Sequence, residues 1–129
     1  MKLDSHEFRS RCSIARALEI IGDRWTLLVI RDLMWHGKDT FLALQGSEER
    51  IPANLLAQRL KRLEALGILR REAYQQRPVR YRYLLTEEGL SLEPVLLELM
   101  AWGHAKLEGG FYHPDTQRSV PAGTSGRNR

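Results

Sequence analysis

Residues 51–67 read IPANLLAQRLKRLEALG, and this stretch decides how the rest of the chain is interpreted. The leucines that recur at helical spacing are Leu56, Leu60 and Leu63. Residues at that spacing share one face of a helix. Asn54, Gln58 and Lys61 fall on the opposite face, and Gly67 stands where a glycine often ends a helix. The stretch therefore predicts a helix with a packed leucine side and an exposed side of amides and a cation.

The segments before this helix are also helical in pattern. Apolar residues at helical spacing predict a first helix that ends at Gly22. Asp23 and Thr40 are suited to cap a second and a short third helix through their side-chain oxygens. Residues 46–50 are loop-like, so the third helix and the 51–67 helix form a helix-turn-helix unit.

After Gly67 the apolar period changes to two. Residues 68–74 and 80–85 predict two strands, joined by a hairpin tip at residues 75–79. Thr86 is suited to cap a further helix, and Pro94 separates its first turn from a longer apolar helix that runs to Leu107. The expected fold is mainly α with a small β-hairpin, in the order α-α-α-α-β-β-α, a winged helix-turn-helix.

The charge is concentrated near the helix-turn-helix unit. The whole chain of 129 residues carries +4. Nine lysine and arginine residues and two glutamates lie between positions 50 and 82, which gives that segment +7 and the remainder −3. A basic segment on an otherwise slightly acidic chain is the pattern expected for a polyanionic partner.

The ordered set of motifs resembles the HxlR-type winged-helix transcriptional regulators of bacteria. The resemblance is carried by residues 12–18 (CSIARAL), 21–28 (IGDRWTLL), 56–60 (LAQRL), 78–83 (PVRYRY), 85–87 (LTE) and 102–103 (WG). It covers residues 12–103. It departs at Pro52, where similar sequences often have a serine that caps the helix, so the exact start of that helix is left open.

The resemblance implies a homodimer that binds operator DNA. In that family the first and last helices build the dimer. This matches the last helix here, because the apolar residues of segment 90–107 cover more than one helical face and leave one for a second subunit. The implied interface residues are Ile14, Leu18, Leu92, Leu96, Leu99 and Trp102. The expected layout is a flexible segment at 1–11, a DNA-binding and dimerisation domain at 12–110 and a disordered tail at 111–129.

The candidate DNA-binding residues lie on the 51–67 helix and on the wing. They are Asn54, Gln58, Arg59, Lys61, Arg62, Gln76, Arg77 and Arg80. Amides pair with adenine edges and cations with guanine edges or phosphates. The alternatives are a solvated helix face and a charged hairpin tip that protects the strand edges. Arg59 lies nearer the leucine side, where it either reaches a phosphate or pairs with a local carboxylate.

Cys12 is the one cysteine and the only candidate chemical sensor. Some similar proteins use a cysteine at this position to detect oxidants or electrophiles; the alternative is an inert residue packed at the first helix. The four histidines show no metal-ligand spacing. No catalytic pairing or phosphate-binding loop is present in the sequence, so we expect no enzyme, metal or cofactor.

The sequence therefore predicts a DNA-binding transcriptional regulator that binds an inverted-repeat operator as a homodimer, with an unidentified effector. The expected partner is double-stranded DNA. The alternative is a winged-helix interaction module whose basic face binds an acidic partner. The N-terminus has no apolar signal segment and no apolar run is long enough to span a membrane, so a cytoplasmic location is expected.

Overall fold

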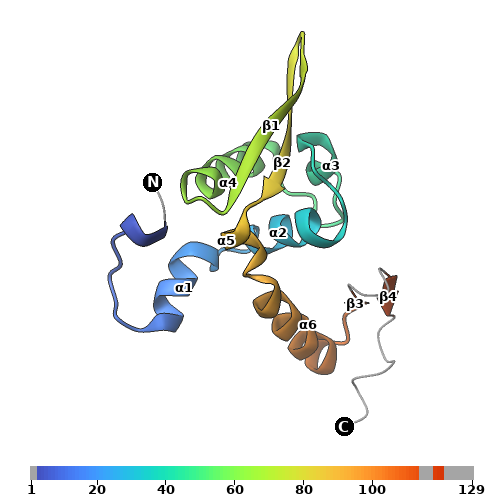
Figure 1. Ribbon diagram of the computed structural model, residues 1–129. Coiled ribbons are helices and arrows are strands. Elements are labelled where there is room, and N and C mark those ends of the chain that lie inside the picture. Colours follow the sequence, from blue (N-terminus) through green and yellow to red (C-terminus); the bar gives the residue numbers. More distant parts are fainter. Residues whose placement is uncertain (1–2, 114–117, 121–129) are drawn as a thin grey trace. The chain divides into compact units, whose positions relative to one another are not determined.

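The computed structural model describes residues 3–113 and 118–120, which fall into two compact units that divide after Leu90. Each unit is described by itself (Figure 1). The first contains a 3-10 turn, five helices and a β-hairpin, and the second contains one long helix and two short strands. The prediction of a mainly α chain with a small β-hairpin is confirmed.

The helices of the first unit begin and end close to the positions expected from their caps. Their bounds are Leu3–Ser5 (η1), Ser13–Ile21 (α1), Thr26–Trp35 (α2), Phe41–Gln45 (α3), Ala53–Ala65 (α4) and Glu87–Leu90 (α5). The N–H of Gly22 closes α1 on the carbonyl of Leu18 at 2.8 Å. The Thr40 hydroxyl accepts the N–H of Ala43, as predicted for the cap of α3. Gly67 has a φ of +80°, a conformation that favours glycine and turns the chain out of α4.

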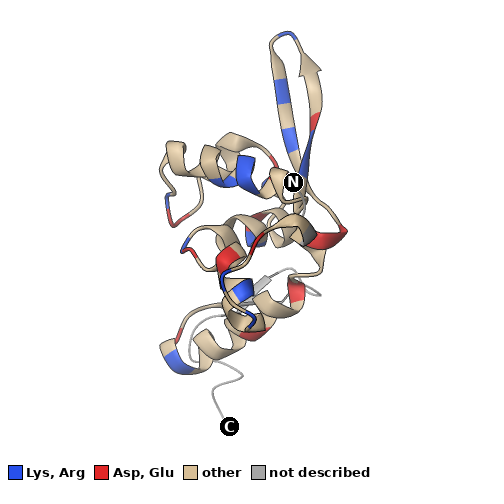
Figure 2. Ribbon diagram, turned by 90° about the vertical axis from the view of Figure 1, so that its left-hand side faces the viewer, with Lys and Arg blue, Asp and Glu red and all other residues tan. Residues whose placement is uncertain are grey.

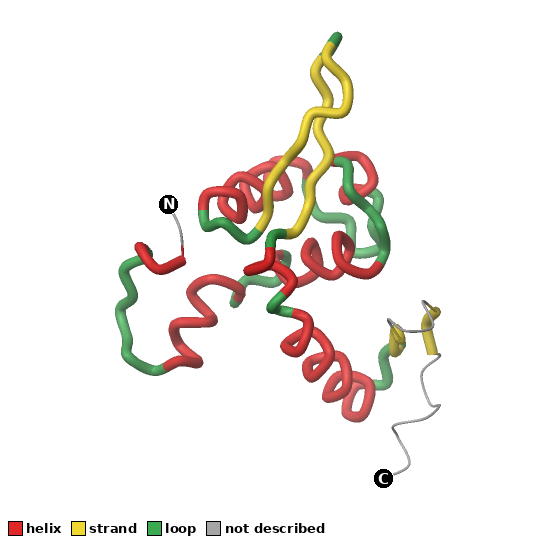
Figure 3. The backbone as a smooth tube through the Cα atoms, in the orientation of Figure 1, coloured by secondary structure: helices red, strands yellow, loops and turns green. Residues whose placement is uncertain are grey.

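The hairpin consists of strands Leu69–Gln76 (β1) and Val79–Leu85 (β2), which pair antiparallel. Its turn is shorter than the predicted tip at 75–79, because the strands continue to Gln76 and Val79. The pairing register shifts between Ala73 and Gln75, so that β1 contains one extra residue there. Figure 3 shows the two strands extending beyond the helices of their unit.

The core of the first unit explains why the hairpin stands next to α4. Its buried apolar residues come from α1, α2, α3, α4, the residues that flank α4 and the start of β1: Ile20, Ile21, Val29, Ile30, Leu44, Ile51, Leu56, Leu60, Leu63, Leu66, Ile68 and Leu69. The predicted leucine side of α4 is thus confirmed. At the base of β2, the N–H of Tyr83 donates to the carbonyl of Asp39 at 2.7 Å. This bond attaches the hairpin to the loop between α2 and α3.

Residues 3–11, the described part of the segment expected to be flexible, make polar contacts with α1. The N–H of Arg9 donates to the Glu19 carboxylate at 3.3 Å, and Arg16 Nε donates to the Ser10 carbonyl at 2.6 Å. The Arg16 guanidinium also lies 4.9 Å from the centre of the Phe8 ring. These contacts hold the segment along α1, because α1 presents both a carboxylate and a cation to it.

The second unit is built on helix Glu93–Leu107 (α6), followed by strands Phe111–His113 (β3) and Arg118–Val120 (β4). Pro94 lies in the first turn of α6, and α5 is separate from it, as the proline predicts. The two short strands pair antiparallel, within the part of the chain expected to be a disordered tail. Aromatic and β-branched residues in those segments favour strand pairing. The rest of the predicted tail, 114–117 and 121–129, lies outside the described residues.

Candidate nucleic-acid interface

The outward face of α4 is exposed along its length. Asn54, Gln58 and Lys61 are all exposed, on the side opposite the buried leucines. The helix begins at Ala53, and Pro52 is the N-cap residue without a side-chain cap bond. The start that the sequence left open is therefore at Ala53, which puts Asn54 in the first turn, where backbone N–H groups have no partner within the helix.

The turn that leads into α4 is fixed by a group of polar side chains. Ser47 Oγ donates to the carboxylate of Asp32, which is only 2% exposed. Arg31 donates two bonds to Glu49, at 3.0 and 2.9 Å. These bonds from Arg31 hold the pKa of Glu49 below its ordinary value. Because the 46–51 turn is tied to α2 in this way, the N-terminal end of α4 is held in place.

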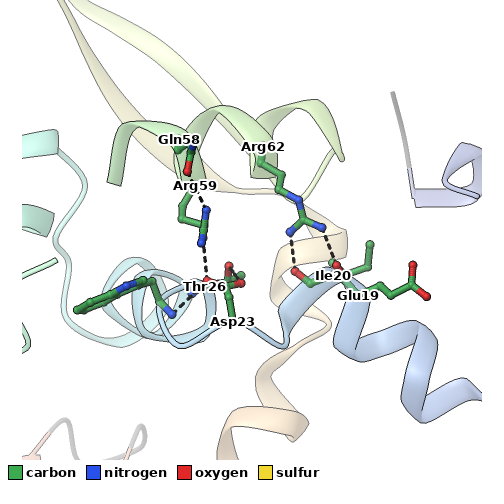
Figure 4. A network of polar contacts seen from close by, with 8 residues as sticks. Glu19, Ile20, Asp23, Thr26, Gln58, Arg59 and Arg62 are labelled. Carbon is green, nitrogen blue, oxygen red and sulfur yellow. Dashed lines mark hydrogen bonds and ion pairs between the residues drawn. The ribbon is translucent and has the colours of Figure 1, made fainter. Parts of the chain in front are cut away.

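Two of the predicted contact residues on α4, Arg59 and Arg62, face into the subunit instead (Figure 4). Arg59 Nε donates to Asp23 Oδ2 at 2.8 Å. The carboxylate alternative for Arg59 is thus the one that the structure supports. Arg62 donates to the carbonyl oxygens of Ile20 at 2.9 Å and Glu19 at 2.6 Å. Both terminal nitrogens of the Arg62 guanidinium are thus bound to the backbone of α1, and its predicted contact with DNA stays a prediction.

The Asp23 carboxylate accepts hydrogen bonds both from Arg59 of α4 and from the start of α2. It accepts the N–H groups of Trp25 at 3.1 Å and Thr26 at 3.0 Å, and the Thr26 hydroxyl at 2.5 Å. Burial acts to raise the pKa of Asp23, but the hydrogen bonds from Thr26 and Arg59 outweigh it and lower the pKa to about 2. Asp23 therefore stays charged. As predicted, it accepts the first N–H groups of α2, which begins at Thr26.

The wing presents a mixed polar and cationic surface. Gln76, Arg77 and Arg80 are exposed at its outer end, and Figure 2 shows lysine and arginine positions along the hairpin and at its tip. Nearer α4, Arg71 pairs with Glu64 at 3.3 Å, and Arg70 pairs with Glu72 at 3.2 Å. Both carboxylates of the basic segment are thereby neutralised, so the exposed cations around them determine the local potential.

Arg50 is not among the contact residues predicted from the sequence. Arg50 is exposed two residues before the Pro52 cap, and its φ of +56° is unusual for a residue with a side chain. The sequence feature that could have indicated a contact is its position as the last cation before α4. The backbone conformation that directs it was not readable from the residue type.

Cys12 is exposed and is the N-cap residue of α1. Its side chain is therefore not packed within this chain. Its N–H donates to Ser10 Oγ at 3.1 Å. Arg16, one turn further along α1, is bound to the Ser10 carbonyl and stacked on Phe8, as described above. Its guanidinium is thus committed to the segment before the helix.

The predicted dimer residues differ in their exposure. On α1, Ile14 is 71% exposed and Leu18 58% exposed. On α6, Leu99 and Trp102 are exposed, Leu92 is half-buried, and Leu96 is buried. Leu96 is the exception, because a side chain already buried within one chain has little surface to offer a second. Val95 joins Leu99 and Trp102 at helical spacing and is also exposed.

Two further properties bear on function. Among the described residues, no group of three or more His, Cys, Asp or Glu side chains is arranged to hold a metal ion. Within the same part of the chain, no helix is both long enough and apolar enough to cross a membrane.

Comparison with known proteins identifies the relatives of this chain. The model of the HxlR-like helix-turn-helix family matches residues 20–110. An uncharacterized HTH-type transcriptional regulator from Mycobacterium tuberculosis is 40% identical over 99 residues, which are 77% of this chain and 61% of that relative. The chain thus spans about three fifths of the length of that protein.

Solved structures share both the fold and part of the sequence. The reduced form of the transcriptional regulator YodB from B. subtilis is 34% identical, with a TM-score of 0.62 over 79% of this chain and 100% of that one. The redox regulator HypR in its reduced form is 34% identical, with a TM-score of 0.65 over 75% of this chain and 95% of that one. These neighbours are winged-helix regulators, so the predicted winged helix-turn-helix is confirmed.

Proposed function

Because the chain belongs to the HxlR-like helix-turn-helix family, we propose that it is a transcriptional regulator that binds an inverted-repeat operator as a homodimer. The observation that carries this proposal is the surface formed by the outward face of α4 and the outer half of the wing. That surface combines exposed amides with exposed cations, while the nearby glutamates are paired with arginines. Such a surface is complementary to the edges and phosphates of a DNA groove.

The exposed residues divide into two roles. Asn54, Gln58 and Lys61 lie on the helix that enters the major groove, where amides pair with adenine and a lysine with guanine. Arg77 and Arg80 on the wing neutralise phosphates beside it, as does Arg50 at the start of α4. Gln76 lies among the wing cations and adds an uncharged donor there.

The dimer proposal rests on apolar surface that each unit leaves exposed. Ile14 and Leu18 lie one turn apart on α1, and Val95, Leu99 and Trp102 form a stripe on α6. Exposed apolar stripes of this kind mark subunit interfaces. A two-fold dimer would bind half-sites whose centres are separated by about 10 base pairs or a multiple of that.

A binding titration tests the proposal. Fluorescence anisotropy with the protein's own upstream DNA and a scrambled duplex, at two salt concentrations, should give tighter binding to the upstream DNA at both. The logarithm of the affinity should fall linearly with the logarithm of the salt concentration. Equal binding to both duplexes, or none, would favour the alternative in which the basic face binds an acidic protein.

We also propose that Cys12 makes the regulator responsive to oxidants. The supporting observations are the exposure of Cys12 at the start of α1 and the similarity to YodB and HypR, the latter described as a redox regulator. Since the chain has one cysteine, two Cys12 thiols from two subunits would lose two protons and two electrons to an oxidant such as diamide, and form one disulfide. Diamide treatment should produce a dimer on a non-reducing gel that Cys12→Ser abolishes. Treatment with diamide and glutathione together tests the other form, a mixed disulfide between Cys12 and glutathione, visible as a mass increase that Cys12→Ser abolishes.

A further inference from the structure

We infer that Arg59 and Arg62 form a clamp that fixes α4 against the junction of α1 and α2, and thereby sets the operator spacing that the dimer accepts. This inference rests on the proposed function, since it concerns the same DNA-binding helix. Both arginines lie in the basic segment, yet each is bound to the junction of α1 and α2; Arg59 in addition donates to Gln58 Oε1 at 3.2 Å. They are positioning residues, and the clamp acts on where the contact residues are held.

Arg62 caps the C-terminal end of α1, although it lies more than forty residues further along the chain. Its two terminal nitrogens donate to the carbonyls of Glu19 and Ile20, in the last turn of α1. Carbonyls in the last turn of a helix have no partner within the helix and carry its partial negative charge. The planar fork of arginine binds two such oxygens at once, which a lysine ammonium does not do with the same fixed geometry. The bond thus fixes both the distance and the orientation between α4 and α1.

Arg59 binds the α2 side of the same junction. It donates to Asp23, and Asp23 at the same time accepts the first N–H groups of α2. Arg59 and Arg62 are three residues apart on α4, so they leave the helix from neighbouring positions. One arginine therefore holds the end of α1 and the other holds the start of α2.

The clamp connects the proposed dimer face to the DNA-binding face. α1 carries Ile14 and Leu18 at its exposed side and the carbonyls bound by Arg62 at its end. In a two-fold dimer that contacts through α1, any shift of α4 relative to α1 occurs twice. A base-pair step is about 3.4 Å, so a shift of roughly half that in each subunit moves the two helices apart by one step. A fixed α1–α4 geometry therefore selects one spacing of half-sites.

Operator spacing provides the test. The operator is first selected by the wild-type protein from a pool of random duplexes. Duplexes are then made in which the distance between its half-sites is changed by one or two base pairs. Dissociation constants are measured by fluorescence anisotropy for the wild type, Arg62→Met, Arg62→Lys and Arg59→Met, with Lys61→Met as the control on the outward face. Sedimentation velocity establishes that each variant remains a dimer.

For the wild type we expect a marked preference for one spacing. In Arg62→Met that preference should fall on the order of tenfold, the factor associated with loss of a charge-assisted hydrogen bond. Arg62→Lys keeps the charge but lacks the planar fork, so its preference should fall by a similar factor. This variant replaces Arg62→Met in the test if the methionine variant does not fold. Lys61→Met should weaken binding to every duplex while the preference among spacings stays as in the wild type.

Two results would overturn the inference. The first is an Arg62 variant with an unchanged spacing preference. The second is an equal loss at all spacings with a shallower salt dependence, which would make Arg62 a phosphate contact. If the wild type selects no operator at all, the proposed function fails, and the clamp's role in spacing fails with it.

Discussion

The two sides of α4 carry the same kinds of side chain and use them in opposite ways. On the side toward α1 and α2, Arg59 and Arg62 are bound to a carboxylate and to two carbonyls. On the outward side, Lys61 is exposed, as are Arg77 and Arg80 on the adjacent wing. Within one segment of +7, some cations stabilise the subunit and others remain available to a partner. The sum of charges in a segment therefore does not identify the binding residues, whereas the direction of each side chain does.

Loss of Arg62 should have the largest effect and would test this comparison most severely. Arg62→Ala leaves two carbonyls of α1 without their charged donor, so we expect the free energy of unfolding to fall by about 2 kcal/mol. Lys61→Ala, one residue away, should change it by less than about 0.5 kcal/mol. Urea denaturation followed by circular dichroism measures both. Equal effects would remove the distinction between the two sides.

Gln58→Ala should sharpen the comparison on the outward side. If its amide pairs with one adenine, removing it should reduce discrimination at that base pair by about 1–3 kcal/mol and leave discrimination elsewhere intact. Binding to a set of operators with single base changes measures this. An even loss across all positions would mean that Gln58 contacts the backbone.

The inward side should also respond to pH through Asp23. Its folded-state pKa of about 2 lies below the ordinary value of 3.8, so it contributes stability that is fully present above pH 4. That contribution is lost as the pH falls from about 4 toward 2. We expect the loss to be about 1–2 kcal/mol, allowing for partial solvent screening. In Asp23→Asn this part of the pH dependence should be absent. A wild-type curve that coincides with the variant's between pH 4 and pH 2 would contradict the assignment.

The smallest expected effect is on the wing. Arg77→Ala should weaken binding to all duplexes by tenfold or less and reduce the slope of log affinity against log salt by about one. Its unfolding free energy should not change measurably, since Arg77 is exposed at the hairpin tip. A selective loss at particular base pairs would instead place Arg77 in a groove.

The fold was predictable where the chemistry is local. Thr40 caps α3 through its own side chain, Gly67 takes the backbone conformation that ends α4, and Pro94 begins a new helix, each for reasons visible within a few residues. The leucine side of α4 was readable for the same reason. Asn54, Gln58 and Lys61 are exposed because they lie opposite it.

Interactions between distant parts of the chain were not predictable. The partners of Arg62 are backbone carbonyls, which every residue has, so no residue type marks them. The extra residue of β1 near Tyr74 leaves no simple signature either. Leu96 shows the same difficulty, since helical spacing cannot tell a buried apolar face from one that is left exposed.

The attachment of the hairpin at Tyr83 has a consequence for how the wing can vary in length. The N–H of Tyr83 is bound to Asp39, and from there outward β1 and β2 pair only with each other. Residues added in pairs to both strands beyond this anchor would lengthen the reach of the wing while every side chain kept its face. A single added residue would exchange the two faces of its strand. Wing length is thus adjustable in steps of two residues per strand without change to the core.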